Sequence, residues 1–140
     1  MALPTSLRLE FVTPERAIAH EDVDEVVMPG SEGDFGVLPG HAPLLATLRT
    51  GLMWYRKGAQ TTYAFVAGGF AEVVPDRVSV LAQVAERAED IDEQRAEAAK
   101  RRAEEQLSGP TVSEMDFERA RIAALRAMAR LQVSRHARKR

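Results

Sequence analysis

The chain has 140 residues, of which 45% are hydrophobic and 29% are charged, and its formal net charge is −2. This composition is typical of a globular protein with one medium domain or a small domain plus an appendage, and it leaves no overall basic field for nucleic acid. The absence of cysteine excludes disulfides, a thiol nucleophile and cysteine-ligated metal sites.

The first residues and the apolar stretches indicate where the protein resides. Residues 1–6 lack the basic segment and apolar run of a signal peptide, and the uncharged stretches are too short and interrupted to cross a bilayer. We therefore expect a cytosolic protein without direct membrane insertion, whose contact with a membrane comes through a partner.

Glycine and proline are concentrated in the first part of the chain. Residues 1–86 hold eight of the nine glycines and six of the seven prolines. Their net charge is −5, whereas residues 87–140 carry +3. Because dense glycine and proline demand turns and their absence permits long helices, we predict two domains, residues 1–87 and 88–140.

The first domain is predicted to be an antiparallel β-sandwich or flattened barrel. Leu7, Leu9 and Phe11 alternate with polar residues, as in a half-buried strand. Further strands are expected at apolar runs in residues 23–28, 35–38, 44–48, 52–55, 63–66, 70–74 and 78–84. Turn signals separate these runs at residues 29–30, 39–40, 57–58, 68–69 and 75–76. The acidic run in residues 21–25 is interpreted as a solvated strand edge.

The second domain is predicted to be an antiparallel two-helix hairpin, which makes the fold class α+β. Asp90, with Glu93 three positions later, is the expected cap of a first helix that runs to about Leu107. Ser113, with Asp116, is expected to cap a second helix that ends near Ser134, and the basic tail 135–140 is expected to fray. The predicted contact faces consist mostly of alanine: Ala96, Ala99, Ala103 and Leu107 in the first helix, and Phe117, Ala120, Ala124, Ala127 and Leu131 in the second.

These alanine faces bury little apolar area, so the hairpin is expected to be held weakly. The first helix is acidic and the second is basic, so the second can pair with the first or with another acidic surface. A mobile element and an ordinary permanent hairpin both fit this pattern, and composition alone does not separate them.

A search for chemical motifs gives no positive case for an enzyme. The glycines of residues 30–36 match neither a dinucleotide-binding loop nor a Walker loop, which favours a tight β-turn. His20, His41 and His136 stand far apart, so no metal site is expected. The acidic first domain and the lack of aromatics among the basic residues argue against a nucleic-acid-binding protein. The polar loop 29–41 could be a plain connection or a docking loop.

Several segments resemble the epsilon subunits of bacterial F-type ATP synthases. The specific one is residues 27–45, VMPGSEGDFGVLPGHAPLL, and residues 68–73, GGFAEV, also match. The helical part contributes DIDEQRA at residues 90–96 and AKRRAEE at 99–105. The resemblance covers almost the whole chain in the same order, and it implies a β-sandwich followed by a two-helix hairpin.

The resemblance also implies a function. Family members are non-catalytic subunits of the rotating central stalk, where the sandwich binds the gamma subunit and sits on the ring of c subunits, coupling proton flow to ATP synthesis. Such a subunit lies on the cytoplasmic face of the inner (plasma) membrane, as a peripheral component. The ring-facing loop of the family corresponds here to Glu32, Asp34 and His41.

Two further properties are implied for the helices. In the family they can extend into the catalytic head, contact the alpha and beta subunits, and block ATP hydrolysis, for which Arg119, Arg126 and Arg130 are the candidate residues. A plain solubilising face is the alternative for these arginines. Some members bind ATP on the folded hairpin as a regulatory ligand, and no other cofactor is expected. The matching residues here are Glu86, Ile91, Asp92, Arg95, Ala96, Arg126 and Arg130. An ATP-sensing module is thus the alternative function, and Asp92 is equally well explained as a first-turn acid that stabilises its helix.

Overall fold

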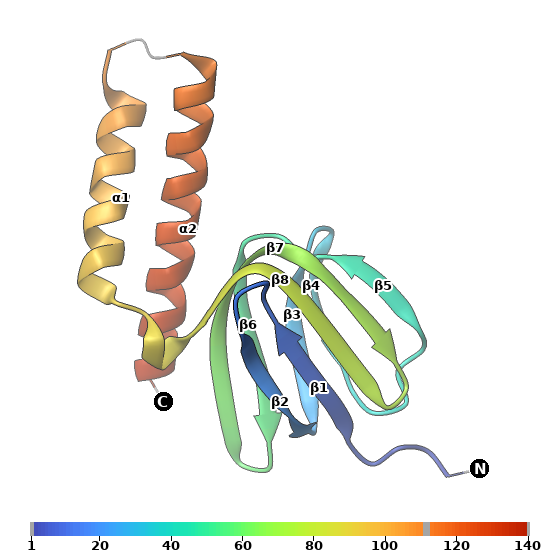
Figure 1. The fold of residues 1–140 in the computed structure, drawn as a ribbon. Helices are drawn as coiled ribbons and strands as arrows, with labels where there is room; N and C mark the ends of the chain where they lie inside the picture. The colour runs from blue at the N-terminus through green and yellow to red at the C-terminus, as the bar shows by residue number, and fades with distance from the viewer. Residues whose placement is uncertain (1, 111–112, 140) are drawn as a thin grey trace.

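The computed structural model describes residues 2–110 and 113–139. Within these residues the chain forms eight strands, a short 3-10 helix and two α-helices. The strands are β1 (Leu7–Val12), β2 (Ala17–Val23), β3 (Glu25–Gly30), β4 (Gly33–Val37), β5 (Leu44–Thr47), β6 (Gly51–Lys57), β7 (Gln60–Val74) and β8 (Arg77–Arg87). The helices are η1 (Ala88–Asp90), α1 (Glu93–Ser108) and α2 (Glu114–Arg138). Figure 1 shows the two α-helices side by side, with their base and the C-terminus near η1 and their tip pointing away from the strands.

The strands form the predicted sandwich, with one departure from an antiparallel arrangement. Their order is β2-β1-β8-β7-β6-β3-β4, and β5 pairs with the second half of β7. β1 and β8 run parallel, whereas the other pairings among the described strands are antiparallel. The polar edge predicted at residues 21–25 belongs to β2 and the start of β3, where Arg8 pairs with Asp22 and Arg56 pairs with Asp24 and Glu25. The strand β2 itself was not among the predicted ones.

The turn predicted at Gly68–Gly69 is wrong, because β7 continues through it. Gly68 and Gly69 adopt φ angles of +74° and +117°, which are accessible mainly to glycine. Around this pair β7 stays in register with β8, while its other edge changes partner from β6 to β5. The glycines therefore bend one long strand instead of ending it.

The sandwich has a core of its own. The large buried cluster contains Leu7, Leu9, Phe11, Val26, Met28, Val37, Met53, Val66, Val73, Val78 and Val80 among others, and its members all lie between Leu7 and Ala85. Because no described helical residue contributes to this cluster, the sandwich does not depend on the hairpin for its main apolar burial.

The helix boundaries differ from the predicted ones at two ends. The N-cap of α1 is Asp92, whose carboxylate accepts a hydrogen bond from the Arg95 N–H at 3.0 Å, and not Asp90, which lies in η1. Ser113 caps α2 as predicted, accepting from the Asp116 N–H at 3.1 Å. The tail does not fray where predicted, since α2 continues to Arg138; Arg140 lies outside the described residues.

The alanine faces of the hairpin are largely confirmed. Ala96, Ala103, Ala120, Ala124, Ala127 and Leu131 are buried, and Ala99 and Leu107 are partly buried. Phe117 is the exception, because it lies on the predicted face but is 46% exposed near the tip of the hairpin. None of the described helices is long and apolar enough to span a membrane.

A second, smaller cluster joins the hairpin to the sandwich. We call Phe65 and Ala67 of β7, with Ala129 and Val133 of α2, the hairpin interface. Leu52, Tyr63, Val84, Ala88 and Ile91 pack around it and are only partly buried. Phe65 is the one large side chain among these four, and α2 contributes just Ala129 and Val133 to the buried set, so the hairpin is docked through a small contact.

Candidate functional site

A pocket at the base of the hairpin brings together most of the residues implied for ATP. It has a volume of about 330 Å³ and lies between the end of β8, the first turns of α1 and the middle of α2. Five predicted residues line it, namely Glu86, Asp92, Arg95, Ala96 and Arg130. We call this cavity the base pocket.

The residues from α1 reach the base pocket because of where this helix begins. Asp92 caps the helix, and Arg95 and Ala96 follow on its first turn. Asp90, Ala99 and Arg102 also line the pocket, although the sequence analysis did not select them as ATP-binding residues. Ala99 and Arg102 lie four and seven positions after Arg95, so helical spacing from Arg95 is the signal that could have found them.

An ion pair closes the opposite side of the base pocket. Arg130 Nε lies 2.5 Å from Glu86 Oε1, and both side chains are roughly three-quarters buried. The Arg130 guanidinium also lies 4.5 Å from the centre of the Phe65 ring, a cation–π contact. A phosphate group could reach Arg130 only by competing with the Glu86 carboxylate.

Two other predicted residues lie elsewhere. Ile91 packs around the hairpin interface and does not line the base pocket. Arg126 is partly buried on α2, and its Nε has no hydrogen-bond partner among the described residues. Of the three arginines predicted to contact the catalytic head, Arg119 is exposed, whereas Arg126 and Arg130 face packed surroundings.

The three residues predicted to face a ring of c subunits do not form one cluster. Glu32 is exposed in the turn between β3 and β4, and Asp34 pairs with Arg49. The neighbouring Ser31 N–H bonds to Thr47 at the end of β5. His41 precedes the start of β5, where its Nδ1 lies 2.7 Å from the Ala42 carbonyl oxygen. The strand β5 therefore separates Glu32 and Asp34 from His41.

The outer face of the sandwich carries an apolar surface that the sequence analysis missed. Phe70 on β7 is paired directly with Leu81 on β8, and they are 45% and 43% exposed. Leu45, on the adjacent strand β5, is 69% exposed. We call Leu45, Phe70 and Leu81 the outer apolar patch. Large apolar residues at outward positions of adjoining strands were the available signal.

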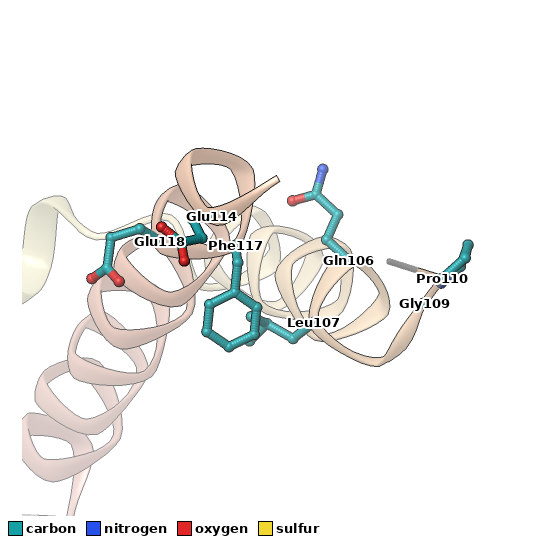
Figure 2. A pocket seen from close by; sticks show the side chains of 7 residues that line it. All are labelled: Gln106, Leu107, Gly109, Pro110, Glu114, Phe117 and Glu118. Carbon is teal, nitrogen blue, oxygen red and sulfur yellow. The ribbon is translucent and has the colours of Figure 1, made fainter. Parts of the chain in front are cut away.

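A separate pocket lies at the tip of the hairpin (Figure 2). It has a volume of about 510 Å³ and is lined by Gln106, Leu107, Gly109, Pro110, Glu114, Phe117 and Glu118. Figure 2 shows the Phe117 ring beside Leu107, with Glu114 and Glu118 on the same helix. It contains none of the predicted site residues, so we assign it no part in the nucleotide site.

Comparison with known families covers nearly the whole chain. Residues 6–88 match the family described as ATP synthase, Delta/Epsilon chain, beta-sandwich domain. Residues 89–135 match ATP synthase, Delta/Epsilon chain, long alpha-helix domain. The chain is 50% identical over 128 residues to an ATP synthase epsilon chain of Nitratidesulfovibrio vulgaris, covering 91% of this chain and 95% of that one. It is 48% identical to that of Syntrophobacter fumaroxidans, with the same coverage.

Solved structures show the same fold in distant proteins. A chain in the cryo-EM structure of the Euglena gracilis mitochondrial ATP synthase, OSCP/F1/c-ring, aligns with a TM-score of 0.83 at 22% identity. The alignment covers 100% of the present chain and 85% of the Euglena chain. A chain in the Tetrahymena thermophila mitochondrial ATP synthase central stalk/c-ring structure aligns with a TM-score of 0.62 at 11% identity, covering 95% and 99% of the two chains.

Proposed function

The chain belongs to the delta/epsilon family of ATP synthase subunits, and we propose that it is a non-catalytic central-stalk subunit of a bacterial F-type ATP synthase. In this role it couples proton translocation through the c-ring to ATP synthesis and restrains ATP hydrolysis through its helices. The observation that carries this proposal is the pairing of a sandwich that has its own core with a hairpin docked through a small interface. The sandwich can therefore stay bound to the stalk while the hairpin moves.

The outer apolar patch is the surface we assign to the gamma subunit. Its three large side chains lie exposed on neighbouring strands of the rigid sandwich. Glu72, which is paired with Leu45 across the strands, and Arg77 form an ion pair at its edge. An apolar centre with a charged rim is the usual composition of a stable protein interface.

Loss of the outer apolar patch is expected to release the subunit from the stalk. Because buried aromatic and aliphatic anchors carry most of an interface's binding energy, the double variant Phe70→Ser/Leu81→Ser should weaken gamma binding by more than roughly tenfold. The measurement is co-purification of the tagged full chain with co-expressed gamma. Leu3→Ser is the control, because Leu3 is 78% exposed and lies outside the patch. Retention of gamma by the double variant at wild-type levels would exclude this surface.

The polar residues around β5 suit the proposed contact with the c-ring. Glu32 and Asp34 at one end and His41 at the other border a strip of sandwich surface, and no membrane-spanning helix is found in the described chain. Attachment through polar loops at the surface of the membrane would make the subunit a peripheral component of the cytoplasmic face.

Inhibition of hydrolysis requires the hairpin to undock. In the docked structure Arg130 is held by Glu86 and packs over Phe65, so it is unavailable to the alpha and beta subunits. Arg119, Arg126 and Arg130 follow one another at intervals of seven and four residues and therefore lie along one side of α2. Undocking would present all three arginines to an acidic surface at once.

ATP sensing is the second candidate, and the base pocket favours it. Five of the residues implied by the resemblance line one cavity of about 330 Å³. Arg95 and Arg102 supply cations there, and the Asp92 carboxylate is an acceptor for an amino group. ATP bound in this pocket would hold α1 and α2 together and would oppose undocking.

Isothermal titration of the full chain with ATP tests this second candidate. We expect saturable heat for the wild-type chain, and a loss of affinity of roughly tenfold or more for Arg95→Gln, since a hydrogen bond to a charged group contributes about 1.5–3 kcal/mol. Arg101→Gln is the control, because Arg101 is exposed on the same helix and does not line the pocket. Absence of heat up to millimolar ATP would dismiss the sensing role and leave the stalk role untouched.

A further inference from the structure

One carboxylate ties the start of α1 to the end of α2. Glu93 accepts a hydrogen bond from the Ser134 hydroxyl at 3.0 Å, and Arg138 Nη2 lies 3.1 Å from Glu93 Oε1. Arg135 Nε lies 3.4 Å from the same oxygen, while its Nη2 bonds to Glu97. We call Glu93, Ser134, Arg135 and Arg138 the Glu93 cluster.

This cluster lies where it can control the hairpin. Glu93 is the first residue of α1, directly after the cap Asp92, so it marks the point at which the chain leaves η1 for the hairpin. Farther along, the two helices meet mainly through alanines, among them Ala96, Ala103 and Ala124. Alanine contacts bury few carbon atoms, so polar bonds at the base make up a large share of what holds the helices together.

We propose that the Glu93 cluster is an electrostatic latch that sets how often α2 separates from α1, and that dissolved ions competing for Arg135 and Arg138 release it. The inference rests on the proposed function in assuming that the two helices of the hairpin can separate. It adds the residues that hold the two helices together, and two of them, Arg135 and Arg138, lie in the tail that the sequence alone led us to expect frayed.

The exposure of these side chains makes the latch reversible. Glu93 is 28% exposed, whereas Arg135 and Arg138 are 47% and 66% exposed. Pairs with this much solvent contact are screened by salt and contribute little individually. Three donors on one carboxylate together stabilise the closed state more than any single pair does. Removal of the acceptor is therefore expected to raise the open population about three- to tenfold.

The absence of cysteine in the chain allows a clean distance measurement. Cysteines introduced at Gln94 and Lys139, both exposed and outside the Glu93 cluster, carry two spin labels on the full chain. The doubly labelled chain is compared with its Glu93→Gln variant in 50 mM and 1 M sodium chloride. Glu114→Gln is the matched control, because Glu114 is likewise the first residue of its helix and makes no ion pair within the described part of the chain.

The expected result is a mostly short distance for the parent chain at low salt, with a long-distance population that grows at high salt. Glu93→Gln should show the larger long-distance population already at low salt and little further response, and Glu114→Gln should match the parent. Arg138→Gln added to Glu93→Gln should have less effect than it has alone, because the two residues share one interaction. An unchanged distribution in Glu93→Gln, or an equal change in Glu114→Gln, would overturn the latch.

Acid gives an independent readout. The hydrogen bond from Ser134, aided by the charges of Arg138 and Arg135, lowers the pKa of Glu93 below its ordinary 4.5. Glu97 is the further acid that contacts this cluster, through Arg135. Because the closed-state pKa is the lower one, the latch is complete above about pH 4.5 and is lost as the pH falls through the lowered pKa. The open population should therefore rise below pH 4.5 in the parent and not in Glu93→Gln; parallel acid responses would contradict the assignment.

These experiments separate the latch from the stalk function. They use the isolated full chain and need no ATP synthase. If Glu93→Gln opens the hairpin while ATP hydrolysis by the assembled complex stays unchanged, the latch stands and the inhibitory role fails. If the hairpin does not open, the latch fails whatever the complex does.

Discussion

Replacing Gly69 by alanine is expected to destabilise the sandwich by about 3 kcal/mol or more, since backbone strain and overpacking each cost about 1–3 kcal/mol. A Cβ at this position would lie 2.1 Å from the Leu81 carbonyl oxygen and 2.7 Å from Ala82 Cα. Both atoms belong to the backbone of β8, so no side-chain rotation relieves the clash. Gly69 also has a φ of +117°, which an L side chain rarely adopts.

Gly58→Ala is the control for the conformational part of this loss. Gly58 also has a positive φ, +61°, but a Cβ there meets nothing within 4 Å. Its cost should be about 1–2 kcal/mol, the ordinary penalty for a left-handed residue. Urea denaturation of the two variants measures the difference. Equal losses would mean that β7 does not approach β8 as closely as described.

The same glycine pair shows why part of the fold was not predictable from the sequence. Gly68–Gly69 looks like a turn when read locally, because two adjacent glycines usually interrupt strands. Whether the chain turns or only bends depends on the partners available on both sides, here β8 on one edge and β6 followed by β5 on the other. This pairing is set by the tertiary structure and leaves no local signature.

The helices of the hairpin, in contrast, were largely predictable from local sequence patterns. Helical spacing of alanines predicted the buried faces of both helices, and Ser113 was identified as a cap from local chemistry alone. The cap of α1 was misplaced by two residues because the capping-box spacing of Asp90 and Glu93 favoured Asp90, whereas Asp92 is followed by Arg95 at that spacing. η1 occupies residues 88–90 and so moves the start of α1 to Glu93.

The candidate site was predictable where it lies on one helix and not where it depends on docking. Asp92, Arg95 and Ala96 line the base pocket because they share the first turns of α1. Arg130 joins them only because α2 docks on β7, where Glu86 and Phe65 hold it. The ordered end of α2 has the same origin, since Arg135 and Arg138 find Glu93 only when the hairpin is folded.

Deleting residues 91–140 is expected to leave assembly of the subunit intact and to raise ATP hydrolysis by the complex severalfold. The core of the sandwich includes no residue beyond Ala85, so this part should fold without the hairpin. The outer apolar patch and the polar residues around β5 also remain. The deletion removes the groups proposed to reach the alpha and beta subunits, Arg119, Arg126 and Arg130, together with the base pocket and the Glu93 cluster.

The variant Arg119→Gln tests whether the charge of this one residue contributes to the inhibition. Arg119 is exposed in the docked structure, whereas Arg126 and Arg130 have surroundings that their replacement would disturb. We therefore expect Arg119→Gln to leave the stability of the free chain within about 0.5 kcal/mol of the parent, as for other surface substitutions. It should relieve part of the inhibition that the deletion removes fully.

The most direct test of the account compares ATP hydrolysis by complexes that contain either the full chain or a chain ending at Asp90. Incorporation of the two chains is first matched by quantifying each against gamma. If the sandwich binds the stalk and the hairpin restrains the catalytic head, both chains should be incorporated equally. The complex with the shortened chain should then hydrolyse ATP faster. Equal hydrolysis at equal incorporation would contradict the account, because the hairpin would then have no inhibitory effect on ATP hydrolysis.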